Sequence, residues 1–368
     1  MTRRGGELVA GPVARAAPDT ARGPIRLGRG AQASPKSPLW IRGPWWDGFW
    51  ILSGLPIALA LLLLSPSIYL VLAVTILFEH AHFLSPMTLA WWHTGFRGLM
   101  LQRPMKFIGV PILIILATTT IGVLTSRFVP DLKVDVGTTV RVYDFADYKQ
   151  PFVMLVVLYF LWNNFHFGMQ NFGVLSIYRV KSGSGTRRKD MIYCLGVQFA
   201  SAIMVYARVL QLDRDDMRSF YFLAAAAGIV AMLMTETRWS PRILFIIADG
   251  VALMFFVQSF LWGFAIWSVN HWFVAIGLSS HVYGVQRGRS PAPFVLGLLA
   301  ASVLVFWLIF GSGVNLHTIF DPKFVARTTI ILMSVRYGVA FTHFLYDRWL
   351  WQFSNPDVRA TIGKDLFA

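Results

Sequence analysis

The chain contains a series of apolar segments, each about as long as the roughly 20 residues that a helix needs to cross a bilayer. About ten segments of this kind can be marked, covering residues 48–65, 67–84, 106–125, 152–177, 191–210, 219–235, 243–262, 264–284, 294–311 and 327–350. Only 14% of the residues are charged, whereas a soluble domain carries about 25%. The segments predict an all-α fold, a polytopic integral membrane bundle of about ten transmembrane helices.

Basic residues lie in short stretches that alternate with these segments. Residues 94–106, 179–190, 237–242 and 286–293 are basic, whereas 211–218 carries three aspartates. Because basic loops stay on the cytoplasmic side, this alternation predicts that both termini are cytoplasmic. The net charge of +15 is explained by orientation in a membrane, so we expect no nucleic-acid partner. The expected location is the bacterial inner membrane.

The same reading divides the chain into three parts. Residues 1–44 are rich in Arg, Gly, Ala and Pro, which predicts a disordered basic cytoplasmic tail. Residues 45–352 form a single transmembrane helical domain, and residues 353–368 form a short cytoplasmic C-terminal tail. The one cysteine, Cys194, excludes an intrachain disulfide and a cysteine-rich metal site.

Histidines inside the apolar segments are the strongest functional signal in the sequence. Six of the eight histidines lie in or at the ends of these segments, namely His80, His82, His166, His271, His281 and His343. A polar group in lipid needs a partner, so such histidines are seldom accidental. Counted along the predicted helices, five of them lie roughly 20–25 Å below the outer surface, in the cytoplasmic half of the bilayer. Only His271 is expected to lie higher.

Imidazoles at one depth, with carboxylates near them, predict a metal centre. The predicted ligands are His80, His82, His166, His281, His343, Glu79, Asp249 and Asp347. His80 and His82 cannot both face one point on a regular helix, so either can be the ligand. Other polar side chains are predicted to contact substrate or to orient ligands, namely Asn163, Gln170, Asn270, His271, Arg336 and His93. No catalytic acid or base is assigned.

Imidazole with carboxylate and no thiolate suits iron, zinc, manganese or copper(II). The expected cofactor is a metal ion, iron in one or two copies, with haem as the alternative. A site among apolar helices favours a membrane lipid, a carotenoid or another hydrophobic substrate, and its depth allows a redox partner to reach it. The sequence therefore predicts a membrane metal-dependent oxidoreductase of lipid metabolism, namely a non-haem iron oxygenase, desaturase or hydroxylase.

The distribution of the histidines is similar to that in the bacterial membrane β-carotene dioxygenases, which also carry single histidines on separate membrane helices. That resemblance implies a membrane oxygenase. Membrane fatty-acid desaturases and hydroxylases carry HxxxH and HxxHH boxes, and this chain has neither, only the HxH of His80 and His82. Three other classes stay open: a haem-binding membrane cytochrome, a metal- or proton-coupled transporter, and an assembly factor of a membrane complex.

Overall fold

The computed structural model describes residues 39–64, 68–128, 151–209, 215–258, 260–310 and 322–367. The described chain is built from helices, turns and connecting segments and contains no strand. The prediction of an all-α fold is therefore confirmed.

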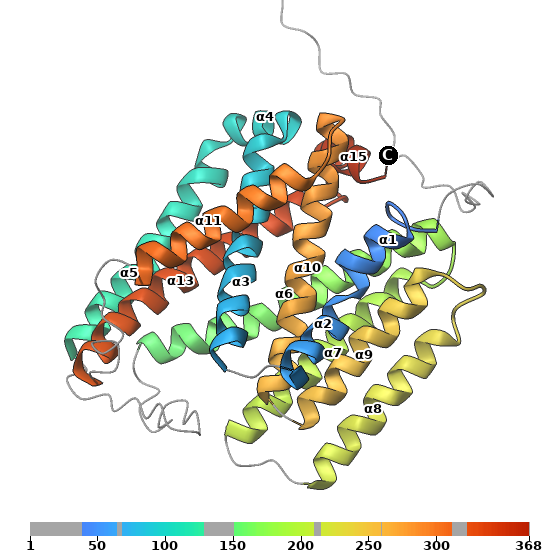
Figure 1. Ribbon diagram of the computed structural model, residues 1–368, viewed down its shortest axis with the longest axis horizontal. Helices are drawn as coiled ribbons and strands as arrows, with labels where there is room; N and C mark the ends of the chain where they lie inside the picture. Colours follow the sequence, from blue (N-terminus) through green and yellow to red (C-terminus); the bar gives the residue numbers. More distant parts are fainter. Residues whose placement is uncertain are drawn as a thin grey trace, which may run out of the picture.

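Long helices make up most of the structure (Figure 1). They are α2 (Gly54–Leu64), α3 (Ile68–Trp92), α5 (Val110–Phe128), α6 (Pro151–Ser182), α7 (Arg187–Val209), α8 (Asp215–Leu233), α9 (Pro241–Gln258), α10 (Phe260–Arg287), α11 (Ala292–Phe310) and α13 (Pro322–Leu350). The shorter helices are α1 (Pro44–Asp47), α4 (Thr94–Gln102), α14 (Pro356–Val358) and α15 (Lys364–Leu366). π-Helical turns cover Gly48–Leu52, Met105–Gly109 and Arg359–Gly363.

Ten membrane spans are not confirmed. Among the described residues, one helical stretch, Met105–Arg127, is long and apolar enough to cross a bilayer by length and composition alone. Ser219–Leu233 and Ala292–Leu304 are apolar but shorter. Several of the other long helices carry buried polar side chains, which lower their mean hydropathy. In α6, for example, Asn163 and His166 are buried polar residues.

Helix α10 is the centre of the structure. Every residue from 267 to 282 is buried, as expected for a helix surrounded by others. It packs against α2, α3, α9 and α11. Two glycines permit close approach, because a Cβ on Gly54 would collide with the backbone of Asn270 and one on Gly277 would collide with the Trp50 side chain.

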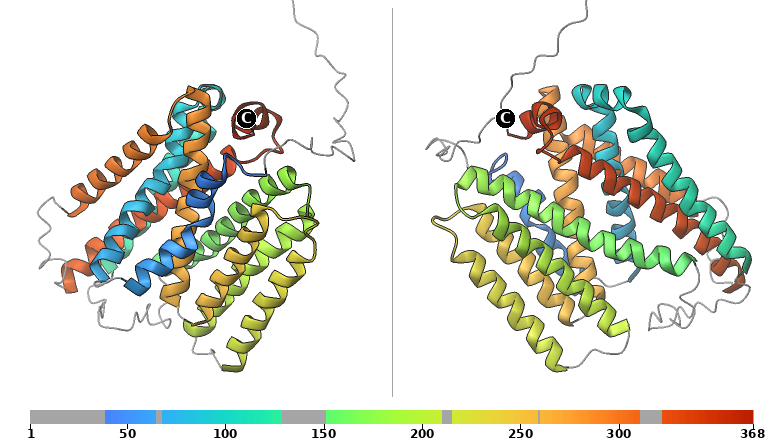
Figure 2. Two further views of the ribbon diagram at one scale, coloured as in Figure 1. Left: turned by 45° about the vertical axis from the view of Figure 1, so that its right-hand side comes forward. Right: turned by 180° about the vertical axis from the view of Figure 1, so that it is seen from behind.

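Two groups of helices lie on either side of α10 (Figures 1 and 2). One group contains α3, α5, α11 and α13, and the other contains α7, α8 and α9. Helices α5 and α13 pack most tightly, since a Cβ on Gly122 would meet Ser334 and one on Gly338 would meet Thr118. Small residues at such contacts let helix backbones approach closely.

Helix α6 connects the two groups. It contacts α7 and α9 in one group and α5 and α13 in the other, and Figure 2 shows it crossing behind both. Because α3 and α13 also contact each other and α3 contacts α10, the helices α3, α6, α10 and α13 meet near the middle of the molecule.

Both ends of the described chain pack onto the bundle. The fully buried Asp47 carboxylate accepts hydrogen bonds from the backbone N–H groups of Ile41 and Arg42, at 2.7 and 3.0 Å, and from the Tyr178 hydroxyl at 2.8 Å. Residues 41–43 are thus held against α6, although they belong to the segment predicted as a tail, of which residues 1–38 lie outside the description. In the predicted C-terminal tail, Ile362 and Leu366 are completely buried.

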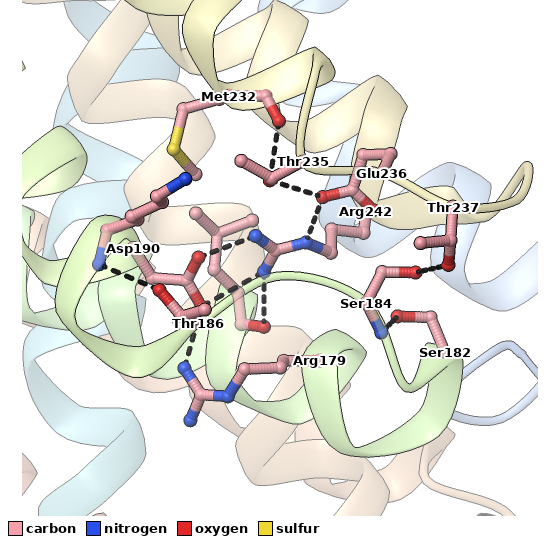
Figure 3. Close-up of polar contacts among 12 residues, drawn as sticks. Arg179, Ser182, Ser184, Thr186, Asp190, Met232, Thr235, Glu236, Thr237 and Arg242 are labelled. Carbon is pink, nitrogen blue, oxygen red and sulfur yellow. Dashed lines mark hydrogen bonds and ion pairs between the residues drawn. The ribbon is translucent and has the colours of Figure 1, made fainter.

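A buried ion network joins α6, α7 and α9 at one end of the bundle (Figure 3). The Arg242 guanidinium, fully buried, donates two hydrogen bonds to the Asp190 carboxylate, at 2.5 and 3.0 Å, and one to Glu236 at 2.7 Å. Arg179 donates to the same Asp190 carboxylate at 2.7 Å. The network pairs two guanidinium groups with two carboxylates and links the first turn of α7 to the turn between α8 and α9.

We expect Arg242→Gln to destabilise the fold by about 3–5 kcal/mol, because the substitution leaves buried carboxylates without their cation. Thermal unfolding of the purified protein in detergent measures the effect. Arg187→Gln is the matched control, since Arg187 is exposed on α7 and its loss should change stability by less than about 0.5 kcal/mol. Equal unfolding midpoints for the two variants would contradict the role given to the network.

Candidate metal centre

Four histidines from four helices meet where α3, α6, α10 and α13 converge. They are His82 on α3, His166 on α6, His271 on α10 and His343 on α13, and all four are buried. One ring nitrogen of each can be chosen so that all four nitrogens lie within 4.8 Å of one another. Four helices thus deliver one imidazole each to a common point.

The four rings form a closed circle of edge-on contacts. Ring centroids of His82 lie 4.4 Å from His271 and 4.1 Å from His343. Those of His166 lie 4.9 Å from His271 and 5.3 Å from His343. Each contact is close to perpendicular, with interplanar angles of 67–81°. Ring nitrogens therefore point toward a shared interior.

Most ring nitrogens of this group form no hydrogen bond with the described residues. Both ring nitrogens of His82, His271 and His343, and Nε2 of His166, are buried without a hydrogen bond. Each such atom would cost about 1–3 kcal/mol if nothing satisfied it. A metal with nitrogens at about 2.1 Å holds opposite ligands about 4.2 Å apart, close to the observed spread. Small side-chain rotations are enough to bring the four nitrogens onto one ion, so the four histidines fit a metal site.

Aromatic side chains enclose the four histidines. The ring of Phe167 lies 4.2 Å from His271, and the ring of Phe344 lies 4.4 Å from His166. Phe83 packs 5.3 Å from His343. Each phenylalanine directly follows a cluster histidine in sequence but stacks on a histidine of another helix. This packing excludes water from the site and fixes the rings relative to one another.

Asp347 is the carboxylate next to this group. Its Oδ2 lies 3.3 Å from Nε2 of His166 and 3.4 Å from Nε2 of His343, in neither case aligned as a hydrogen bond. The Trp351 indole donates to the other oxygen, Oδ1, at 3.3 Å. One carboxylate oxygen is therefore held by Trp351 while the other is directed toward two imidazoles. This arrangement allows Asp347 to ligate a cation or to orient its ligands.

The other predicted histidines lie elsewhere. His281 is buried with its ring 5.4 Å from that of Trp46, near the N-terminal segment. His80 is half-buried and is not one of the four. His93 caps α4, where its Nδ1 accepts a hydrogen bond from the Phe96 N–H at 3.2 Å and its Nε2 lies 3.0 Å from Asp365. That contact ties α4 to the C-terminal segment.

Histidine 271 occupies the place predicted for His281. The two residues are ten positions apart on α10, which is about 15 Å along a helix, so both cannot reach one ion. The prediction placed each histidine by counting residues along its helix. That count assumes that all helices begin at the same depth in the membrane and run parallel. Figure 2 shows instead that α13 is tilted against α10, and a tilted helix gains less depth per residue. His343 therefore meets His271 rather than His281.

The two remaining predicted carboxylates have other partners. Asp249 on α9 accepts a hydrogen bond from the Asn171 amide at 2.7 Å, between α6 and α9. Glu79 on α3 forms an ion pair with Arg336 on α13.

The amide side chains that were predicted to contact substrate or to orient ligands lie in different surroundings. Asn163 lines a small cavity beside His82. Gln170 has buried amide atoms without a hydrogen-bond partner, and Asn270 packs against Gly54 of α2.

No protein-family model matches this chain, and neither the curated proteins nor the solved structures contain a match to it.

We expect His271→Ala to remove most bound metal and His281→Ala to retain it. Both variants replace a buried histidine of α10 by alanine. Comparing them therefore separates the loss of a metal ligand from a general loss of packing. The metal content of each purified variant, measured by elemental analysis per protein chain, gives the result. Equal loss in both variants, or loss in neither, would contradict the assignment of the four histidines.

Asp347→Asn should weaken metal binding by about 10–100-fold, the usual effect of removing a carboxylate that orients ligands. A chelator competition titration measures the affinity. Asp249→Asn is a matched control, because Asp249 is equally buried but lies with Asn171. An unchanged affinity in Asp347→Asn would show that this carboxylate does not act on the ion.

Proposed function

We propose that the protein is an integral membrane metalloenzyme in which His82, His166, His271 and His343 bind iron, and that it oxygenates, desaturates or hydroxylates a hydrophobic substrate. The observation that carries the proposal is the meeting of four buried imidazoles from four helices, with candidate ligand nitrogens within 4.8 Å. Their unsatisfied nitrogens need an ion to complete them.

The outer surface of the bundle supports location in a membrane. Large apolar side chains are exposed on several helices, including Leu116 on α5, Ile192 on α7 and Leu223 on α8, each with more than half of its surface accessible. In water such exposure would be costly, whereas in lipid it is the expected state. Within the described ranges, Met105–Arg127 alone meets the length and hydropathy of a span, so the full number of spans is part of the proposal.

The proposed orientation rests on basic residues at one end. Arg97 and Arg103 near α4, and Arg287 and Arg289 after α10, are all exposed. These two regions are joined, because the amide of Gln286 donates a hydrogen bond to the Thr94 hydroxyl at 3.0 Å. The C-terminal helix α15 lies at the same end (Figure 1). By the positive-inside rule this end is cytoplasmic, where a soluble redox partner would reach it.

Iron suits the donor set better than haem. The four rings contact one another edge to face, with centroids 4.1–5.3 Å apart around the circle, and leave no planar slot for a macrocycle. Four nitrogen ligands fill four of the six positions that iron commonly uses, which leaves room for further ligands. Iron held in this way supplies dioxygen activation, and dioxygen is abundant in the apolar interior of a membrane.

The protein's own residues would supply the remaining requirements. Phe167 and Phe344 exclude water from the histidines, which protects a reactive centre from side reactions. Asp347 balances part of the positive charge of the ion. Desaturation or hydroxylation would also take two electrons from an external donor, whereas oxidative cleavage of a double bond consumes dioxygen alone.

Elemental analysis and the optical spectrum of the purified protein test this proposal. We expect about one iron per chain, no Soret band, and an electron paramagnetic resonance signal of an iron–nitric oxide adduct, since nitric oxide reports an open coordination position. His343→Ala should lose both the iron and the signal. A Soret band would show haem, and stoichiometric zinc without an open position would show a structural site; either result would overturn the proposal.

A further inference from the structure

A narrow cavity lies directly beside the four histidines. It is lined by His82 and Glu79 of α3, by Tyr159 and Asn163 of α6, and by Trp272 of α10, with Phe83, Phe167 and Ser268 completing its wall. His82 belongs both to this wall and to the four-histidine group. Whatever enters the cavity therefore comes next to the proposed metal.

The cavity combines an apolar wall with a polar end. Aromatic rings form most of the wall, as is usual for sites that bind hydrophobic molecules. Its volume of about 10 Å³ is close to the minimum that one water molecule requires. A hydroxyl or carbonyl oxygen fits such a space, whereas a large polar head group does not.

An ion pair marks the polar end. Glu79 lines the cavity and pairs with Arg336, whose guanidinium lies 5.9 Å from the centre of the Tyr159 ring. Glu79 lines the cavity itself, whereas Arg336 stands behind it in the ion pair, with 28% of its side chain accessible. Together the two side chains carry no net charge, while the carboxylate retains acceptor positions and the guanidinium retains N–H donors.

A neutral ion pair in an apolar wall selects by charge. A substrate carboxylate or ammonium group would be attracted by one member of the pair and repelled by the other, so the neutral pair does not offset the cost of taking that charge out of water. A hydroxyl group carries no charge and can donate to the carboxylate while it accepts from the guanidinium. Among the common end groups of lipids, a hydroxyl uses both halves of the pair.

Resting on the function proposed above, we propose that this cavity receives the hydroxyl end of an otherwise apolar alcohol, and that Glu79 and Arg336 select it against carboxylates and ammonium groups. Glu79 and His82 are one helical turn apart on α3, about 4.5 Å along the axis. The carbon that reacts therefore lies within a few bonds of the hydroxyl group. Glu79 and Arg336 are positioning residues, since they hold the substrate and do not bind the metal.

Three probes with one hydrocarbon tail test this selection, namely oleyl alcohol, oleic acid and oleylamine. The purified protein is loaded with Co(II), whose visible spectrum reports a molecule bound beside the metal, at a pH where the acid and the amine are both charged. We expect the alcohol to change the spectrum at about tenfold lower concentration, or less, than either charged probe. A charged probe that binds as well as the alcohol would overturn the inference.

Charge substitutions sharpen the test. Glu79→Gln leaves a positive pair and should shift the preference to oleic acid, and Arg336→Gln leaves a negative pair and should shift it to oleylamine. The double variant is again neutral and should restore the preference for the alcohol, which keeps the test decisive if a single variant folds poorly. Asp357→Asn and Arg359→Gln make the same charge changes at exposed positions and should change no preference.

The outcomes separate the two proposals. If the protein binds Co(II) through the histidines but Glu79→Gln and Arg336→Gln behave like the exposed controls, the selection by charge is wrong and the metal centre stands. If His343→Ala binds Co(II) as well as the unsubstituted chain does, the metal centre itself is wrong and the inference fails with it.

Discussion

The burial of four imidazoles whose nitrogens largely lack hydrogen bonds among the described residues is the constraint on which the rest of the structure depends. Three of the rings have both nitrogens buried and unsatisfied, and His166 has one. A core with that many orphaned polar atoms would lose several kcal/mol relative to an apolar one. One ion would satisfy a nitrogen of each ring at the same moment, so that its binding free energy would become part of the stability of the fold. On this view metal and bundle assemble together, and α10 is central because it carries His271 into the point where three other helices meet.

The surroundings of the four histidines follow one local rule. His82, His166 and His343 are each followed by phenylalanine, and His271 by tryptophan. Successive residues on a helix point about 100° apart, so the aromatic ring faces a neighbouring helix when the histidine faces the centre. Phe83 reaches His343, Phe167 reaches His271 and Phe344 reaches His166. The dipeptides thus lock four helices together by the same contacts that keep water away from the histidines.

This rule also shows what the sequence could and could not reveal. The apolar segments were enough for an all-α fold, and position within them was enough to propose His166 and His343, together with either His80 or His82, as members of one site. Depth counting failed to separate His271 from His281, because it treats helices as parallel and level, and tilt is set by packing that no single segment encodes. The distinguishing signal was nevertheless in the sequence, since His281 is followed by valine and His271 by an aromatic residue. The pairing of Glu79 with Arg336 joins positions far apart in the chain and had no local signature.

The partners of the buried carboxylates point to where a cation is needed. Glu79 is neutralised by Arg336 and Asp190 by Arg242, while Asp47 is satisfied by backbone N–H groups and Tyr178. Asp347 forms no ion pair with a lysine or arginine in the described part of the chain; its charged-group neighbours there are His166 and His343. A buried carboxylate without a cation is costly, and protonating two crowded imidazoles would set their charges against each other. A divalent ion among the four neutral rings would resolve both problems, because it would supply a positive charge beside Asp347 at the point where ring nitrogens have no hydrogen bond within the described part of the chain.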